Sequence, residues 1–279
     1  MEEKMTLYKV AKPILGFIYK LWYNPKIIGK ENIPKDGAVV IVGNHVHIMD
    51  QCNVILATKR CIHYMAKKEY FDPSYKEGKF PWFFKGVGCI PVDRSKKDEE
   101  ATKEAINVLK SSEMLGLFPE GTRNSLKEAR AKEIYEKYFL EETIDFNEFY
   151  QKVKKNKTSF INYLEELKDS KVITMDEFKD NVIDADSFLQ DLIKNHRLTR
   201  EEYYNHVLLP LKFGAVSMAH KTNAQIVPYA ITGEYKFRSK NLMIRIGKPF
   251  TADDDLAKAN ERLDLEIKNL MKENEQNKW

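Results

Sequence analysis

Residues 122–209 contain neither a glycine nor a proline. Average usage would supply roughly ten such residues over this length. Glu, Lys, Asp and aromatic residues are frequent, and apolar residues recur throughout, which argues against a disordered tail. The pattern predicts several helices joined by polar turns. Because the flanking sequence follows another pattern, we predict an inserted helical block at 126–207. We detect no internal repeat in the sequence.

Cysteine is scarce, and long apolar runs are absent. The chain has three cysteines, Cys52, Cys61 and Cys89, with no CxxC pair and no metal-like spacing. This argues against a disulfide framework and indicates a reducing compartment. No uncharged apolar run reaches the about eighteen residues that a membrane-spanning helix needs. The first residues lack the basic start and the cleavage site of a signal peptide.

The charge balance is mild. The net charge of +4 does not by itself suggest nucleic-acid binding. Hydrophobic residues make up 43% and charged residues 32% of the chain, which indicates a globular protein with a heavily charged surface.

Residues 7–23 carry an apolar stripe at helical spacing. The stripe comprises Leu7, Val10, Ala11, Ile14, Leu15, Ile18 and Trp22. Lysines lie elsewhere, and Tyr and Trp crowd the ends. The pattern predicts an N-terminal amphipathic helix within 1–27 that lies in the membrane interface. A first helix packed on the core is the alternative. Pro13 predicts a kink, or a helix that begins at that residue.

Strand-like and helix-like segments alternate from residue 37 to 120 and resume after Pro210. The expected strands are 38–42, 62–66, 88–92, 114–118, 226–231 and 242–246. The expected helices are 50–59, 97–111, 212–221 and an amphipathic helix at the C-terminus. This alternation predicts an α/β fold with a mixed, largely parallel sheet flanked by helices. We expect 28–125 and 208–279 to form this domain.

The stretch Gly43–Asp50 follows the first of these strands and carries His45 and Asp50. Their spacing is not that of one helix face, so they meet only if the chain turns between them. Asp50 would then fix the tautomer of His45, and His45 would act as a general base. The alternative is that Asp50 caps the helix that follows.

Three further blocks accompany the HxxxxD pattern of His45 and Asp50. They are Gly88–Ser95 (GCIPVDRS), Phe118–Asn124 (FPEGTRN) and Ile226–Pro228 (IVP). In this order the blocks resemble the glycerolipid acyltransferase family, and the likeness is closest to 1-acylglycerol-3-phosphate acyltransferases. Lys67–Tyr70 (KKEY) resembles the family's Lys-x-Glu-Leu block, with Tyr in place of Leu. The resemblance covers residues 7–124 and 208–250.

The resemblance implies transfer of a fatty acyl group from acyl-CoA or acyl-carrier protein to the free hydroxyl of 1-acyl-glycerol-3-phosphate (lysophosphatidate), which forms phosphatidate in phospholipid biosynthesis. His45 and Asp50 would be catalytic. The thioester is a co-substrate, and no cofactor, metal or nucleic acid is implied. The expected partners are a lysophospholipid and the lipid surface at the cytoplasmic face of the membrane. Since no GxSxG elbow is present, direct attack by the acceptor is favoured over an acyl-enzyme.

Two alternatives remain open at this stage. The same base could serve another lysolipid or glycerol 3-phosphate. The chain could also be a catalytically inactive lipid-binding protein, which the long insertion leaves open. The insertion could cap an acyl tunnel, bind a carrier protein or dock to another membrane protein.

Three basic residues are implied as ligands of the acceptor's phosphate. By resemblance, Lys67 and Arg123 contact it and Arg94 supports them, in keeping with the bidentate geometry of guanidinium and phosphate. A surface salt bridge is the alternative for each.

The resemblance also assigns Glu120, Gly121 and Thr122 to acceptor binding. Glu120 would hold Arg123 or the acceptor, or else pair with a buried backbone turn. Gly121 would allow a close approach of the ligand or a positive φ.

Two residues near His45 need a separate account. The family usually has a Ser at the position of His47, which could contact the acceptor, be a substituted loop residue or form part of a metal pair, although no third ligand is evident. Cys52 is expected to be inert packing rather than a nucleophile. Pro228 is expected to shape the end of a strand.

Overall fold

The computed structural model describes residues 6–76 and 78–276. Its contacts divide the chain into two compact units, Met1–Gly121 with Leu211–Trp279 and Thr122–Pro210. The block predicted at 126–207 falls inside the second unit. The absence of a signal peptide was predicted from the first residues of the chain, and these lie outside the described residues. The start of the predicted segment 1–27 lies outside them too.

The first unit is built on one mixed sheet. Its strands are β1 (Lys26–Ile28), β2 (Val39–Gly43), β3 (Ile62–Lys67), β4 (Ile90–Val92), β5 (Met114–Leu117), β6 (Gln225–Thr232), β7 (Met243–Ile246) and β8 (Phe250–Thr251). The order is β1-β7-β6-β2-β5-β3-β4, and β8 pairs with β6. Strands β7 and β8 run antiparallel to β6, and every other described pair is parallel. The predicted α/β fold with a mixed, largely parallel sheet is confirmed.

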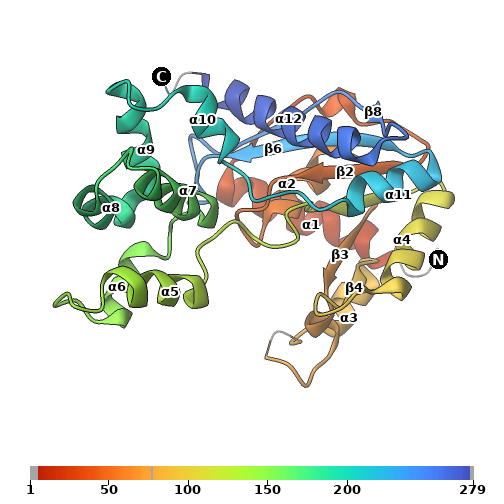
Figure 1. Ribbon diagram of the computed structural model, residues 1–279. Coiled ribbons are helices and arrows are strands. Elements are labelled where there is room, and N and C mark those ends of the chain that lie inside the picture. The colour runs from red at the N-terminus through yellow and green to blue at the C-terminus, as the bar shows by residue number, and fades with distance from the viewer. Residues whose placement is uncertain (1–5, 77, 277–279) are drawn as a thin grey trace. The chain divides into compact units, whose positions relative to one another are not determined.

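Helices cover both faces of this sheet (Figure 1). The helices of the unit are α1 (Thr6–Tyr23), α2 (Asp50–Ala57), α3 (Pro81–Gly86), α4 (Glu99–Lys110), α11 (Gly214–Thr222) and α12 (Leu256–Asn274). Helix α2 contributes Val54 and Ala57 to the hydrophobic core on one face of the sheet. The rest of this core comes mainly from alternate residues of the strands, such as Ile41 and Ile244. Figure 1 shows α11 and α12 along the other face. All the strands and helices expected here are present. The prediction missed β1, β8 and α3, which are too short to show a period.

Pro228 lies inside β6, so the prediction that it shapes a strand end is wrong. Strand β6 pairs with β8 at residues 225–226 and with β7 at residues 229–232. Pro228 therefore stands where one partner strand gives way to the other, and it has no N–H to donate to either of them. Its carbonyl accepts a hydrogen bond from the N–H of Gly247 at 2.8 Å.

Helix α1 runs unbroken through Pro13, so it does not begin at that residue. Three of its polar side chains, Tyr8, Lys12 and Tyr19, face the protein, whereas Lys9 and Lys20 are exposed. Tyr8 and Tyr19 are buried, and the Lys12 ammonium donates to the carbonyl of Thr58, at the end of α2, and to that of Arg60 at 3.2 Å. Its apolar side chains are exposed instead: Val10, Ile14, Leu15, Phe17, Ile18, Leu21 and Trp22. In the described part of the chain, no helix combines the length and apolar character needed to cross a bilayer.

The second unit consists of short helices. They are α5 (Glu128–Tyr138), α6 (Phe146–Val153), α7 (Thr158–Asp169), α8 (Met175–Asn181), α9 (Ala185–Lys194) and α10 (Arg200–Asn205). They form three successive helix pairs, α5–α6, α7–α8 and α9–α10. The second helix of each pair begins after a capping residue, Asp145, Thr174 or Thr199, whose side chain accepts a hydrogen bond from the N–H three residues later.

These three pairs are an internal repeat. An aromatic residue stands four positions after each cap and a valine eight positions after it, and all are buried: Phe149, Phe178, Tyr203, Val153, Val182 and Val207. The α7–α8 and α9–α10 pairs also share a turn, in which Lys171 and His196 adopt positive φ values of 62° and 57°. The prediction of no internal repeat is therefore wrong. The repeat can be seen in the sequence once the caps are known, because a Glu also stands three positions after each of them, but the three copies are unequally spaced.

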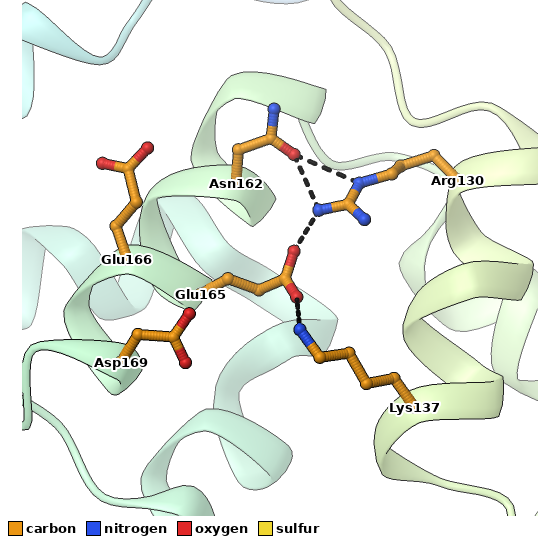
Figure 2. Close-up of a pocket in the computed structure, with 6 residues that line it drawn as sticks. All are labelled: Arg130, Lys137, Asn162, Glu165, Glu166 and Asp169. Atoms are coloured by element: carbon orange, nitrogen blue, oxygen red, sulfur yellow. Dashed lines mark hydrogen bonds and ion pairs between the residues drawn. The ribbon is translucent and has the colours of Figure 1, made fainter.

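Five charged side chains and one amide line a hollow between α5 and α7 (Figure 2): Arg130, Lys137, Glu165, Glu166, Asp169 and Asn162. The Glu165 residue is only 8% exposed. Its carboxylate accepts hydrogen bonds from Arg130, from Lys137 at 3.3 Å and from the Tyr138 hydroxyl at 2.9 Å. Because a buried carboxylate needs such partners, these charges hold α5 against α7 within the unit.

Candidate active site

The chain turns after β2 and brings His45 and Asp50 together. The His45 Nδ1 lies 2.8 Å from Asp50 Oδ2. The same carboxylate oxygen accepts the backbone N–H groups of Val46 at 2.7 Å and His47 at 2.8 Å. Since an oxygen with two N–H donors acts as an acceptor, Nδ1 carries the proton that it shares with Asp50.

Asp50 does not cap the following helix. It is the first residue of α2, the N-cap position is Met49, and no side chain caps this helix. Its carboxylate instead closes the loop before the helix, and the residue is completely buried. The alternative in which Asp50 is a helix cap is therefore wrong, and its contact with His45 is confirmed.

The other ring nitrogen of His45 has no hydrogen-bond partner among the described residues. The ring stacks on Phe118 with centroids 3.9 Å apart and planes 14° apart. The side chain is 14% exposed, so the ring is held on two sides and open on a third. With Nδ1 bonded to Asp50, Nε2 is the basic nitrogen, and it is free to accept a proton from a bound hydroxyl.

Glu120 follows β5 and is bonded to the backbone beside the dyad. Its Oε1 accepts the N–H of His45 at 2.8 Å, and the residue is 3% exposed. The alternative in which Glu120 pairs with a buried backbone turn is the one observed. Gly121 has a φ of +70°, so the expected positive φ is confirmed, and this conformation favours glycine.

His47 has a local packing role. Its ring stacks on Tyr235 with centroids 4.1 Å apart, and its Nδ1 accepts the N–H of Met49 at 3.2 Å. Across residues 6–76 and 78–276 there is no group of three His, Cys, Asp or Glu side chains that could hold a metal ion. The described contacts agree best with the interpretation of His47 as a loop residue.

The candidate residues of the first unit lie at one edge of the sheet. His45 follows β2, Glu120 follows β5, Lys67 ends β3 and Arg94 follows β4. These four strands are parallel neighbours in the order β2-β5-β3-β4, so their carboxyl ends share an edge. Arg94 is exposed, and Lys67 forms a 3.3 Å ion pair with Glu69. Their roles toward phosphate stay predictions.

Thr122 and Arg123 belong to the second unit. Arg123 is exposed. Their roles in acceptor binding also stay predictions. The next residue, Asn124, is buried and structural, because its side chain accepts the N–H of Ser159 at 3.0 Å and donates to the carbonyl of Val207 at 3.1 Å.

The family model for acyltransferases matches residues 24–232, about three quarters of the chain. The chain belongs to the acyltransferase family. The resemblance stated from the motifs is thereby confirmed, and the matched range includes His45, Asp50 and Glu120.

Individual relatives match shorter stretches. The chain is 36% identical over 122 residues to a 1-acyl-sn-glycerol-3-phosphate acyltransferase of Bacillus subtilis, covering 43% of this chain and 58% of that protein. It is 36% identical over 98 residues to a protein of the same name from Streptococcus pneumoniae. This match covers 34% of this chain and 36% of that protein. The chain therefore matches less than two thirds of the length of these relatives.

Among solved structures, the chain is similar to the 1-acyl-sn-glycerophosphate acyltransferase PlsC of Thermotoga maritima. The TM-score is 0.49 at 16% identity, and the match covers 95% of this chain and 83% of that one.

Sequence reasoning missed Tyr235. It lies in the loop between β6 and β7, and its hydroxyl donates to Asp50 Oδ1. The two residues are 185 positions apart, so no local spacing links them. The available signal was a pair of aromatic residues, Tyr235 and Phe237, in an otherwise polar loop after a buried strand.

Cys52 lies in α2, two residues after Asp50, and its pKa is raised to about 12 by burial and by the neighbouring Asp50 charge. The thiol is therefore protonated at pH 8, and a thiol is a poor nucleophile. We predict that iodoacetamide labels Cys52 slowly in the native protein at pH 8, and quickly after unfolding in guanidinium. Mass spectrometry of the digested protein measures both rates.

We also predict that Cys52→Ala retains turnover within about twofold of the wild type. A folded Cys52→Ala protein with turnover reduced a hundredfold would show instead that the thiol takes part in the reaction.

Proposed function

We propose that the chain is an O-acyltransferase that acylates the free hydroxyl of a lysophospholipid, with 1-acyl-glycerol-3-phosphate as the preferred acceptor and phosphatidate as the product. The observation that carries the proposal is the dyad. The dyad lies at the carboxyl edge of the sheet. Asp50 holds His45 by Nδ1, and His45 Nε2 has no hydrogen-bond partner among the described residues. Family membership and the activity named for the two bacterial relatives support the same reaction.

In the proposed reaction, His45 Nε2 takes the proton of the acceptor hydroxyl as its oxygen attacks the carbonyl carbon of acyl-CoA or acyl-carrier protein. A new C–O bond forms, and the carbonyl becomes a tetrahedral oxyanion. When this intermediate collapses, the C–S bond breaks, and the proton passes from His45 to the departing sulfur. The Asp50 carboxylate stabilises the imidazolium between these steps.

The acceptor's phosphate would lie beside this base. Lys67 and Arg94 end or follow parallel strands at the same sheet edge as His45. An ammonium and a guanidinium there would favour an anionic acceptor. By resemblance alone, Arg123 is a third candidate for the phosphate contact. Glycerol 3-phosphate and other lysolipids are the competing acceptors within this proposal.

The first unit also carries features that fit a lipid surface. The apolar side chains of α1 point outward, and Phe80 and Trp82, at the start of α3, are 58% and 63% exposed. Exposed apolar patches of this kind mark interaction sites. Residues 1–121 and 211–279 have 31 Lys and Arg against 24 Asp and Glu, whereas residues 122–210 have 15 against 18. An apolar face on a basic unit fits peripheral binding to anionic lipid.

Replacing His45 with Ala tests the proposed reaction. We expect kcat/KM to fall by about a thousandfold, because the general base is lost while the fold is kept. Release of free thiol from palmitoyl-CoA or palmitoyl carrier protein is measured together with phosphatidate formed from 1-oleoyl-glycerol 3-phosphate. Glycerol 3-phosphate and 1-oleoyl-glycerol, which lacks the phosphate, are run in parallel as alternative acceptors.

His220→Ala is the matched control, because His220 lies in the last turn of α11, ahead of the amino end of β6 and away from the site. It should behave as the wild type. Undiminished thiol release by His45→Ala would overturn the proposed role of the base. If the wild type itself released no thiol above background, the chain would be the inactive lipid binder considered above.

Replacing Phe17 and Leu21 with Glu tests the lipid surface. The two side chains are 69% and 62% exposed, so the fold should tolerate the change. Since each buried apolar side chain contributes about 1.5 kcal/mol or more, we expect vesicle affinity to fall at least a hundredfold. Sedimentation with phosphatidylcholine vesicles containing phosphatidylglycerol measures the bound fraction.

Leu140→Glu is the control for this pair, because Leu140 is 67% exposed but belongs to the second unit. It should bind vesicles as the wild type does. Equal binding by the α1 double variant would exclude this face as the lipid contact.

A further inference from the structure

A chain of hydrogen bonds joins helix α1 to Asp50. The Tyr19 hydroxyl donates to Asn53 Oδ1 at 2.8 Å. The side-chain amide of Asn53 donates to the Tyr235 hydroxyl oxygen at 2.6 Å, and Tyr235 donates in turn to Asp50 Oδ1. Tyr19 is 6% exposed, and Asn53 and Asp50 are fully buried, so water has little access to these bonds.

The donors in this chain all point the same way. Each proton is directed toward the Asp50 carboxylate, and each group accepts from the one before it, so the bonds polarise one another. The pKa of Tyr235 is raised far above its usual value, by burial first and by the Asp50 charge second. Tyr235 therefore stays a neutral donor at any working pH. The chain ends on the oxygen of Asp50 that His45 does not use.

The loop that carries Tyr235 is fastened to the end of α1. The N–H of Arg238 donates to the carbonyl of Trp22 at 2.6 Å. The Trp22 and Phe237 rings meet edge to face with centroids 5.0 Å apart, and Tyr23 meets Tyr235 in the same way at 5.6 Å. Trp22 and Phe237 are 54% and 61% exposed. The position of Tyr235 therefore depends on α1, through the Asn53 bonds and through this loop.

We infer that Tyr235 is a positioning residue for the Asp50–His45 dyad, and that Tyr19 and Asn53 make its position depend on helix α1. The inference rests on the proposed acyl transfer at His45. Tyr235 touches neither substrate nor the reacting atoms. It fixes the second carboxylate oxygen of Asp50, and with it the direction in which the first oxygen holds the imidazole. Contacts of α1 with lipid would then bear on the dyad through these bonds.

The test compares Tyr235→Phe, Tyr19→Phe and the double variant in the full-length protein. Tyr235→Phe keeps the ring that stacks on His47 and removes the hydroxyl, which donates to Asp50 and accepts from Asn53. We expect kcat to fall about tenfold with KM for 1-oleoyl-glycerol 3-phosphate unchanged, because a hydrogen bond to a charged group is lost. The kcat of Tyr19→Phe should fall about threefold. The double variant should be no slower than Tyr235→Phe alone, because both substitutions break the same series of hydrogen bonds.

Tyr23→Phe is the matched control. It removes a hydroxyl from the same aromatic cluster, and this hydroxyl has no hydrogen bond within the described residues. It should keep the wild-type kcat. Unchanged kcat in Tyr235→Phe, or effects of Tyr19→Phe and Tyr235→Phe that simply add, would overturn the inference. If Tyr235→Phe fails to fold, Tyr19→Phe tests the inference by itself. Its kcat should fall about threefold with KM unchanged, and an unchanged kcat would overturn the inference.

A readout without turnover separates this inference from the proposed function. The Nδ1 proton of His45 is followed by NMR as it exchanges with water. We expect the signal of this proton to broaden in Tyr235→Phe, because a less firmly held Asp50 lets the proton exchange faster with water. The signal should stay sharp in Tyr23→Phe. A sharp signal in Tyr235→Phe would contradict the positioning role even if the wild type showed no turnover.

Discussion

A buried carboxylate is the constraint on which the rest of the site depends. An ion without partners inside a protein is strongly unfavourable, so Asp50 must collect hydrogen-bond donors from wherever the fold can supply them. The loop after β2 supplies two backbone N–H groups and the His45 ring, and the loop between β6 and β7 supplies Tyr235. Satisfying one charge thus joins two distant segments of the sequence and leaves the imidazole in a single orientation.

The same logic extends outward from the dyad. Glu120 holds the backbone of His45 from the end of the neighbouring strand, and Phe118 covers one face of its ring. Helix α1 turns Tyr8, Lys12 and Tyr19 toward the protein and most of its apolar side chains outward, whereas a surface helix of a globular protein usually buries its apolar stripe. If α1 binds lipid as proposed, its exposed apolar side chains would make that contact while Tyr19 keeps its hydrogen bond to Asn53.

Much of the fold followed from the sequence, because the buried parallel strands are short apolar runs and the longer helices have clear stripes. The His45–Asp50 contact, the positive φ of Gly121 and the backbone option for Glu120 were also accessible, since each depends on local chemistry. Tyr235 was not, because its contact spans 185 residues. Asp50 was open to misreading as a cap, since a cap and a loop closure use the same side chain. The helical repeat was missed because its three copies are short and unequally spaced, although each has the same order of capping residue, Glu, aromatic residue and Val.

In the proposed reaction, Asp50 fixes the proton of His45 on Nδ1 and leaves Nε2 as the base. NMR of protein labelled with ¹⁵N-histidine tests this assignment directly, with the His45 signals assigned from their loss in His45→Gln. We predict that the neutral ring at pH 8 carries its proton on Nδ1, with Nε2 unprotonated. A neutral ring with the proton on Nε2 and none on Nδ1 would contradict it.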